Sequence, residues 1–465
     1  MRRHTLAREA GATLRLAVPI IVSQLAQVSL GFVDTVMVGR LGPESLAAVA
    51  LGGAPFFAIA LVFLGVCLAT EPLVSQAYGA GDAARVSRSV HSGLWAALLL
   101  SVPAMLVLRA AGALLAWPPL GQAPATAAVA RDYLDALTWS IPGFLVFGAL
   151  RSFCEGVSRP LAVTVIALAS VGVNVVGNLA LIFGRWGAPE LGAVGAGYAS
   201  ALSSTFSAVA LAAFVAVHPA LRRYRPLRIG RPDGPTLREV LRVGLPVGGT
   251  FFVEAGFFGA TALMMGRLGA TSLAAHQIAL QCASVTFMTA LGTGLAGAVR
   301  VGQAAGRGDG PGVRRAGLVS IGLAMAFMTL SAVAFRLMPE RIVGVYLDAG
   351  DASNAAVVSL AIRLLAIAGV FQLFDGLQVA SAGALRGLKD TRAAFVVGLV
   401  AYWGVGLGAG LSFAFGLDGG APGLWWGLVL GLAAAGAGLF GRFLHRTRGA
   451  ALDAAVRQAQ RGVGS

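Results

Sequence analysis

The stretch GRLGPESLAA at residues 39–48 decides the fold, because a near copy of it, GRLGATSLAA, stands at residues 266–275. The offset of 227 residues between the two also relates further matches in the same register. These are Pro19 with Pro246, Met37 with Met264, and VSQAYGAGD (74–82) with VGQAAGRGD (301–309). So many matches at one offset indicate that the two halves of the chain are copies of one structural unit.

The sequence between the matches is almost wholly apolar. Of the 465 residues, 57% are hydrophobic and only 12% are charged, and the mean hydropathy is +0.80. A soluble chain would carry about a quarter charged residues, so this composition indicates an integral membrane protein. The apolar runs are long and unbroken, which excludes the short alternating segments of a membrane β-barrel.

A membrane-spanning helix needs roughly 20 apolar residues, and twelve stretches of the chain reach that length. Their limits are 14–38, 46–70, 90–116, 131–153, 161–184, 192–217, 238–265, 273–299, 316–337, 357–383, 393–416 and 422–444. We therefore predict an all-α polytopic membrane protein with twelve transmembrane helices. Each copy contributes six helices, an even number, so both copies enter the membrane in the same direction. This predicts two six-helix lobes related by a pseudo-twofold axis along the membrane normal.

The segment 218–237 (HPALRRYRPLRIGRPDGPTL) is rich in Arg and Pro and ends where the second copy begins. We interpret it as a cytoplasmic linker. The predicted N-terminal lobe is then 1–217, and the predicted C-terminal lobe is 238–465, including a short cytoplasmic tail.

The net charge of +15 and the pI near 11.2 would suit a nucleic-acid-binding protein. However, most Lys and Arg residues fall in segments that face the cytoplasm if the N-terminus lies inside, as the positive-inside rule requires. The basic excess therefore reflects topology and not nucleic-acid binding. We expect a multi-pass protein of the plasma membrane (the bacterial inner membrane) with both termini cytoplasmic. The three cysteines lack CxxC spacing, so we expect neither a disulfide framework nor a zinc site.

The matched motifs identify a family. Pro19, DTVMVGRLG (34–42) and the following LAA resemble the multidrug and toxic compound extrusion (MATE) family. The second copy, with Glu254, MMGRLG (264–269), LAAHQIA (273–279) and RVGQAAGRGD (300–309), is similar to it too. Acids in the seventh and tenth spans resemble the NorM-type branch. This resemblance implies a V-shaped exporter with two lobes that expels organic cations and is driven by inward Na⁺ or H⁺.

Three acidic residues lie well inside predicted spans: Asp34, Glu254 and Asp375. None is duplicated: the offset of 227 places Thr261 opposite Asp34 and Gln27 opposite Glu254, and a later offset of 231 places Phe144 opposite Asp375. Charges inside a bilayer are costly and usually functional. The three acids therefore serve a role that the repeated scaffold itself does not require.

In the N-terminal half, Ser170, Asn174 and Asn178 recur at intervals of four residues on one face of the fifth span. With Asp34 they would form an oxygen cage for a hard cation. The resemblance assigns Asp34, Asn174 and Asn178 to a cation site, with Ser200 at the position of a family Thr. The alternative is that the two Asn side chains hold helices together through interhelical hydrogen bonds.

In the C-terminal half, the resemblance places a second cation site on Glu254 and Asp375. Na⁺ is expected either there or at Asp34, Asn174 and Asn178. The family often has Tyr one turn before the tenth-span acid, and here that residue is Phe371. The alternative is again a role in packing alone. The remaining polar candidates near these acids are Thr261, Gln281, Ser284, Gln372 and Gln378.

Further residues are candidates for lining a substrate cavity: Gln27, His276, Gln281, Phe371 and Gln372. A lone His suits proton transfer, although near a helix end it can simply bond a backbone carbonyl. Glu71 and Asp135 lie near span ends, where we expect them to be interfacial or solvated.

The sequence contains no HExxH, nucleophile elbow or Walker motif, so we expect neither an enzyme nor ATP-driven transport. The predicted function is efflux of organic cations by antiport with Na⁺ or H⁺, without a cofactor, by a monomer surrounded by membrane lipid. A lipid-linked saccharide flippase of the same superfamily is the alternative, but it would need cationic residues to hold phosphate. A channel or a receptor that does not transport fits asymmetric acids less well.

Overall fold

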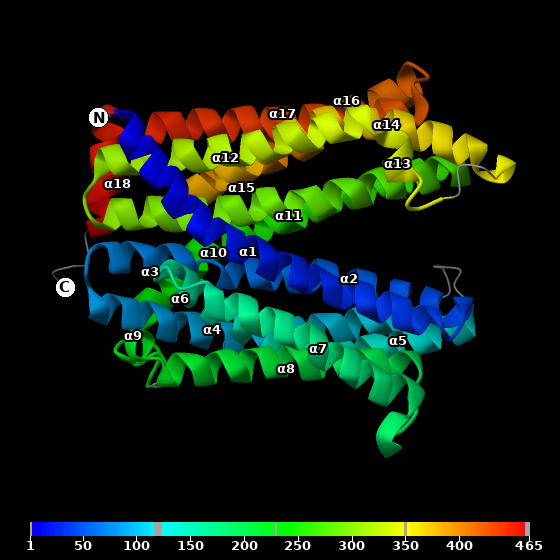
Figure 1. Cartoon of the computed structure of the whole chain (residues 1–465), viewed down its shortest axis with the longest axis horizontal. Coiled ribbons are helices and arrows are strands. Elements are labelled where there is room, and N and C mark those ends of the chain that lie inside the picture. Colours follow the sequence, from blue (N-terminus) through cyan, green and yellow to red (C-terminus); the bar gives the residue numbers. More distant parts are fainter. Residues whose placement is uncertain (1, 116–122, 228–229, 348–350, 461–465) are drawn as a thin grey trace. The chain divides into compact units, whose positions relative to one another are not determined.

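The structure, a computed structural model, describes residues 2–115, 123–227, 230–347 and 351–460, and these ranges contain helices and no strand. The elements of the first half are α1 (Arg2–Gly39), α2 (Pro43–Cys67), α3 (Thr70–Gly79), α4 (Ala83–Leu115), α5 (Pro124–Thr138), α6 (Ser140–Gly156), α7 (Leu161–Phe183), η2 (Arg185–Gly187), α8 (Ala193–Val217) and α9 (Pro219–Arg222). Those of the second half are α10 (Gly234–Arg267), α11 (Ala270–Gly306), α12 (Gly310–Leu337), α13 (Pro339–Val343), η3 (Ala352–Asn354), α14 (Ala355–Gly387), α15 (Thr391–Leu399), η4 (Val400–Gly406), α16 (Leu407–Leu411), η5 (Ser412–Gly416), α17 (Gly420–Arg446) and α18 (Gly449–Gln460) (Figure 1).

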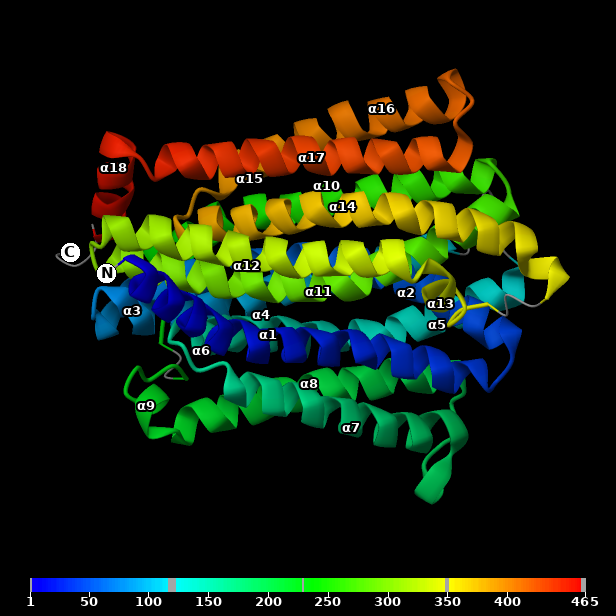
Figure 2. The same ribbon diagram turned by 45° about the horizontal axis from the view of Figure 1, so that its top comes forward.

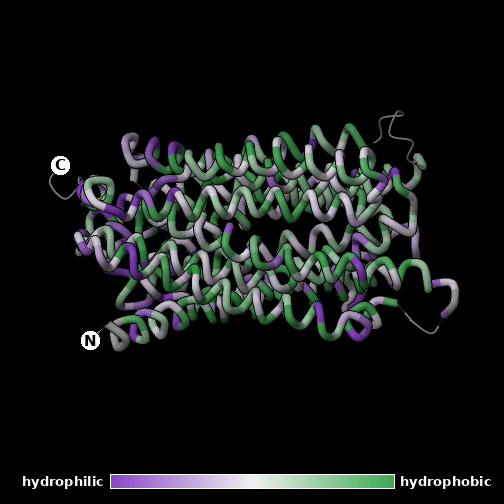
Figure 3. The backbone as a smooth tube through the Cα atoms, turned by 90° about the horizontal axis from the view of Figure 1, so that it is seen from above, coloured by the Kyte–Doolittle hydropathy of each residue, from purple (hydrophilic) through white to green (hydrophobic). Residues whose placement is uncertain are grey.

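Among the described residues, eleven helices are long and apolar enough to cross a membrane, and a bent pair brings the number to twelve. Inside a bilayer every backbone polar group must be bonded within its own segment, and a helix does this. Hydrophobic residues follow the helices along their length, whereas hydrophilic ones gather toward helix ends (Figure 3). The fourth span, predicted as one helix over 131–153, is the bent pair: α5 and α6 meet at an angle of 41°.

The repeated GRLG motif forms the same turn in both copies. Gly42 ends the first turn at φ 112° and ψ 170°, and Gly269, 227 residues later, has φ 110° and ψ 167°. Only glycine adopts such a conformation without strain. The turn therefore explains why this glycine stands at the same place in both copies.

The second repeated motif also keeps its geometry. Asp82 and Asp309 both cap a following helix: each Oδ1 accepts a hydrogen bond of 2.8 Å, from the backbone N–H of Arg85 and Gly312 respectively. These duplicated acids thus serve the scaffold as helix N-caps. This use separates them from the three unduplicated acids inside the spans.

Contacts divide the chain into two compact units, and each is described by itself. The first unit is Val22–Gly248, and the second joins Met1–Ile21 to Gly249–Ser465. The cuts fall inside α1 and α10, two residues after Pro19 and Pro246, so they too obey the offset of 227. The boundaries predicted at 217 and 238 follow the sequence repeat, whereas the packing units divide after Ile21 and after Gly248.

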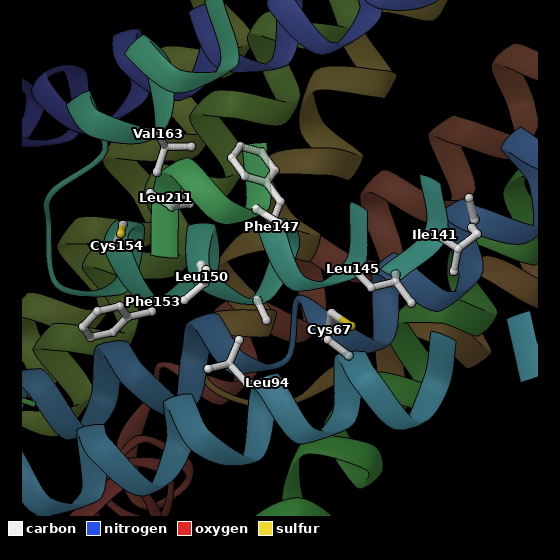
Figure 4. Packing of buried hydrophobic residues seen from close by; sticks show 14 of the residues in the cluster. Cys67, Leu94, Ile141, Leu145, Phe147, Leu150, Phe153, Cys154, Val163 and Leu211 are labelled. Atoms are coloured by element: carbon white, nitrogen blue, oxygen red, sulfur yellow. The ribbon is translucent and has the colours of Figure 1, made fainter. Parts of the chain in front are cut away.

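The unit Val22–Gly248 is built on a hydrophobic core that α6 supplies with Leu145, Leu150 and Phe153, all fully buried (Figure 4). The predicted linker segment packs against the same unit. On α4, the His91 Nε2 lies 2.7 Å from the carbonyl oxygen of Arg225, and the Trp95 Nε1 donates to that of Gly230 at 3.1 Å.

In the unit that contains Gly249–Ser465, glycines let helices approach closely. A Cβ on Gly427 of α17 would collide with the backbone of Gly410 on α16. The eleventh span, predicted as one helix over 393–416, contains two π-helical segments, η4 and η5. Figure 2 shows this span passing behind α17, from α15 below it to α16 above it, and its segments contact α17.

Candidate functional site

The unit Val22–Gly248 brings Asp34, Asn174, Asn178 and Ser200 together. Asp34 Oδ1 accepts hydrogen bonds from Asn174 Nδ2 at 3.0 Å and from Asn178 Nδ2 at 2.7 Å. The Ser200 hydroxyl donates to Asp34 Oδ2 at 2.6 Å. Asp34 is 5% exposed, and both asparagines are fully buried. The predicted grouping of these four residues is therefore present, and neutral donors surround the carboxylate.

Local structure positions this cluster. Asn174 and Asn178 are one turn apart on α7, and the Asn178 Nδ2 also donates to Asn174 Oδ1 at 3.2 Å. Helices α7 and α8 pack closely because Gly177 leaves room for Ala199, which would lie 3.1 Å from a Cβ on that glycine. Ser170 does not join the cluster, since its hydroxyl donates to the carbonyl oxygen of Ala167 at 2.7 Å.

The second unit brings Glu254 of α10 and Asp375 of α14 close enough for their charges to interact. Asp375 is 3% exposed, and Glu254 is half-buried. Unlike Asp34, neither carboxylate has a hydrogen-bond donor among the described residues. Two like charges therefore share a poorly solvated site without neutral donors, an arrangement that favours an added cation or proton.

Two polar side chains lie with this acid pair. Tyr402 of η4 is fully buried and interacts electrostatically with both carboxylates, and Gln378 of α14 lies beside its hydroxyl. Sequence reasoning missed Tyr402. The available signal was a Tyr-Trp pair inside an otherwise glycine-rich span, but nothing in a regular helix pattern directs that residue toward the acids.

His276 sits among aromatic rings in the same unit. It is fully buried, its ring lies 5.8 Å from that of Trp425, and neither ring nitrogen has a hydrogen-bond partner among the described residues. The interpretation that it merely bonds a backbone carbonyl is therefore wrong. Phe371 packs edge-on against Trp425 at 5.7 Å, so the residue at the family's Tyr position belongs to this aromatic group.

The other predicted polar residues bond to a neighbouring helix, to their own helix, or to no partner that the structure specifies. Gln372 donates from Nε2 to the Thr286 hydroxyl. The hydroxyls of Thr261 and Ser284 donate to the carbonyl oxygens of Phe257 and Leu280 in their own helices, each at 2.9 Å. Gln281 is exposed and Gln27 is partly exposed, and neither joins an acid cluster.

A buried ion pair escaped the sequence analysis. Arg151 Nε donates to Glu155 Oε1 at 2.8 Å, with side chains 6% and 1% exposed, and Arg151 Nη1 bonds Gln24 Oε1. Opposite charges four residues apart were the available signal. Glu71, expected to be interfacial or solvated, is instead fully buried on α3, which packs against α4 and α6.

An open pocket in the unit Val22–Gly248 contains none of the predicted site residues. It is lined by Arg109, Arg131, Asp135, Trp139 and Tyr198. Asp135 therefore borders a surface pocket, in accord with its expected position near a span end.

The MatE family model matches residues 19–180 and again residues 246–410. The two matches begin 227 residues apart, so they follow the internal repeat. The chain is 44% identical to the probable multidrug resistance protein NorM of Pseudomonas putida, over 93% of each chain. It is 40% identical to the protein of the same name from a Synechococcus species, over 96% of each chain.

Solved structures share the fold. The eukaryotic MATE transporter AtDTX14 superposes with a TM-score of 0.87 at 21% identity, over 98% of this chain and 99% of the other. An outward-facing multidrug resistance MATE transporter gives a TM-score of 0.85 at 21% identity, over 94% and 96%. The chain thus belongs to the MatE family, the multidrug and toxic compound extrusion proteins, in the branch that contains the NorM proteins.

Proposed function

We propose that this protein is a multidrug efflux antiporter of the bacterial inner membrane, which expels organic cations in exchange for Na⁺ or H⁺. Relatives named as multidrug resistance proteins match along nearly the whole chain, which supports the substrate class. The proposed unit of transport is a monomer with both termini in the cytoplasm. It is a transporter and not an enzyme.

The pairing of Glu254 and Asp375 carries this proposal. Their charges interact, neither accepts a hydrogen bond from a described residue, and neither is duplicated in the repeat. Two such carboxylates are stable in a membrane only when something positive neutralises them. Na⁺, H⁺ and a cationic drug can each do so, and they would compete for the site.

Competition at one site couples the two fluxes. If an inward-moving ion lowers the affinity for the drug by some factor, the drug lowers the affinity for the ion by the same factor. A drug bound from the cytoplasm is then displaced by an ion that arrives from outside. The ion gradient supplies the free energy for efflux.

We assign a secondary role to Asp34. Its carboxylate already accepts three hydrogen bonds, from Asn174, Asn178 and Ser200, so its charge is satisfied without a drug molecule. We propose that Asp34, Asn174 and Asn178 form an additional ion site that tunes coupling.

The flippase alternative receives less support from the charges inside the units. A flippase must hold a phosphate with cationic groups. The buried Arg151 is paired with Glu155, so it is not available as a free cation. The charges beside Tyr402 in the second unit, those of Glu254 and Asp375, are acidic.

The test uses purified protein in liposomes loaded with ethidium, a fluorescent organic cation, under separately imposed Na⁺ and pH gradients. Efflux should depend on at least one gradient. Glu254→Gln and Asp375→Asn keep side-chain shape and remove the charge, and each should lower gradient-driven efflux at least about tenfold. Glu340→Gln is the matched control, because Glu340 is exposed on α13 and has no role in the proposed site.

Normal efflux by both acid variants would show that the acids serve packing alone. Movement of a fluorescent phosphate-bearing lipid, with no ethidium efflux under either gradient, would establish the flippase instead.

A further inference from the structure

The eleventh span is interrupted where it passes the acid pair. After α15 it becomes a π-helix over Val400–Gly406, returns to an α-helix in α16, and is π-helical again over Ser412–Gly416. π-helical turns are rare and are concentrated at functional sites. Figure 2 shows this span running beside α17 within the same unit.

The first π-helical segment fastens two consecutive side chains to α10, on either side of Glu254. The Trp403 Nε1 donates to the carbonyl oxygen of Val253 at 3.0 Å. The Tyr402 ring stacks on that of Phe257, with centroids 5.4 Å apart and planes 9° apart. Glu254 lies between these two attachment points in the sequence of α10.

Two glycines leave the space that the Phe257 ring occupies, and the Tyr402 ring stacks on it. A Cβ on Gly406 would lie 2.6 Å from Phe257 Cζ, and a Cβ on Gly431 would lie 3.1 Å from the same atom. Side chains at these positions would push the ring away. Phe257 is 1% exposed and Tyr402 is fully buried, so the Tyr402 hydroxyl is held in a defined place.

That hydroxyl lies among unsatisfied groups. It faces the Gln378 side chain and interacts electrostatically with Glu254 and Asp375, yet it forms no hydrogen bond of good geometry with a described residue. The Gln378 Oε1 is likewise buried without a hydrogen-bond partner in the described ranges. A buried hydroxyl and a buried amide oxygen are both costly unless something binds them.

We propose that Tyr402 is a direct ligand of the transported ion, with its hydroxyl oxygen completing a Na⁺ site formed by Glu254, Asp375 and the Gln378 Oε1. These four groups supply only oxygen ligands, two of them charged, which is the set that a hard cation prefers. Phe371 leaves the tenth span without a hydroxyl one turn before Asp375, and the π-helical segment supplies one from the eleventh span instead. This inference rests on the proposed function of the acid pair.

The variant Tyr402→Phe removes the hydroxyl and keeps the ring that stacks on Phe257. At fixed pH, it should raise the NaCl concentration for half-maximal ethidium efflux by about tenfold or more, the effect of losing one contact to a charged group. Calorimetric titration of the purified protein with NaCl should show the same loss of affinity. Tyr78→Phe makes the same change at an exposed tyrosine of α3 and should leave both values unchanged.

Fluorotyrosine placed at position 402 gives a second measurement that does not depend on the Phe variant folding. Its fluorine resonance should shift when NaCl replaces KCl, and the shift should disappear in Glu254→Gln. The inference is overturned if Tyr402→Phe binds NaCl with unchanged affinity, or if the fluorine resonance does not shift with Na⁺. In either case, coupled efflux by the unmodified protein would still support the proposed function. Absence of coupled efflux in the unmodified protein contradicts the proposed function itself.

Discussion

Asn178 donates a hydrogen bond of 2.7 Å from its Nδ2 to Oδ1 of Asp34, across 144 residues of sequence. The bond ties α1 to α7 and belongs to a group of three donors around one carboxylate. At the acid pair of the other unit, no such donors exist among the described residues. The two carboxylate sites therefore differ in chemistry. Neutral groups donate hydrogen bonds to Asp34, whereas the pair of Glu254 and Asp375 would be stabilised by a bound cation or proton.

Asp34→Asn should weaken the dependence of efflux on the ion gradient, whereas equilibrium binding of a cationic drug survives. The substituted amide loses the charge that attracts an ion, but Asp34 is not the proposed drug counter-ion. Efflux and binding assays with one cationic and one neutral ligand check this. Asp309→Asn is the matched control, because Asn also caps helices well. Loss of cationic ligands alone would make Asp34 the counter-ion, and no change in either assay would remove it from the mechanism.

Arg151→Leu should destabilise the protein by about 3–5 kcal/mol, because it leaves the buried Glu155 charge without its partner. The double variant Arg151→Leu/Glu155→Leu should recover much of this loss. Thermal unfolding in detergent measures both. Arg315→Leu removes a half-exposed ion pair of 3.8 Å with Asp309 and should cost less than about 1 kcal/mol. Equal losses in the two single variants would contradict a structural role for the buried pair.

Gly427→Ala should lower stability by about 1–3 kcal/mol, since its methyl group would overlap the backbone of Gly410 and force α16 away from α17. Gly404→Ala is the control: it changes the same residue type in the neighbouring span, where a Cβ meets nothing within 4 Å. Its effect should stay within about 0.5 kcal/mol. The midpoints of thermal unfolding of the two purified variants measure this difference. Similar midpoints would show that close glycine packing is unimportant here.

Gly230→Cys should react with a membrane-impermeant maleimide only from the cytoplasmic side, because the linker is predicted to be cytoplasmic. Gly230 is exposed, and the native Cys67, Cys154 and Cys282 are buried, so background labelling should be low. Intact cells and inside-out vesicles provide the two sides. Labelling of intact cells would overturn the predicted topology.

The sequence by itself determined the features that depend on short stretches of chain. The turns at Gly42 and Gly269 and the caps at Asp82 and Asp309 depend on residues a few positions apart, so the repeated motifs form them again in the second copy. The spans follow from apolar length, because backbone bonding in lipid is satisfied within each segment. The stripe of Asn174 and Asn178 follows from helical spacing, and the resemblance supplied Asp34 and Ser200 as its partners.

Only the tertiary structure decided which side chains from distant segments meet. It placed Tyr402 with the acid pair, because a π-helical segment departs from the regular spacing on which sequence reasoning depends. It buried Glu71 by packing α3 against α4 and α6, and it divided α1 and α10 between packing units just beyond their prolines. A helix forms from its own local bonds, but its burial and its neighbours depend on contacts across the whole fold, and these leave no periodic pattern in the sequence.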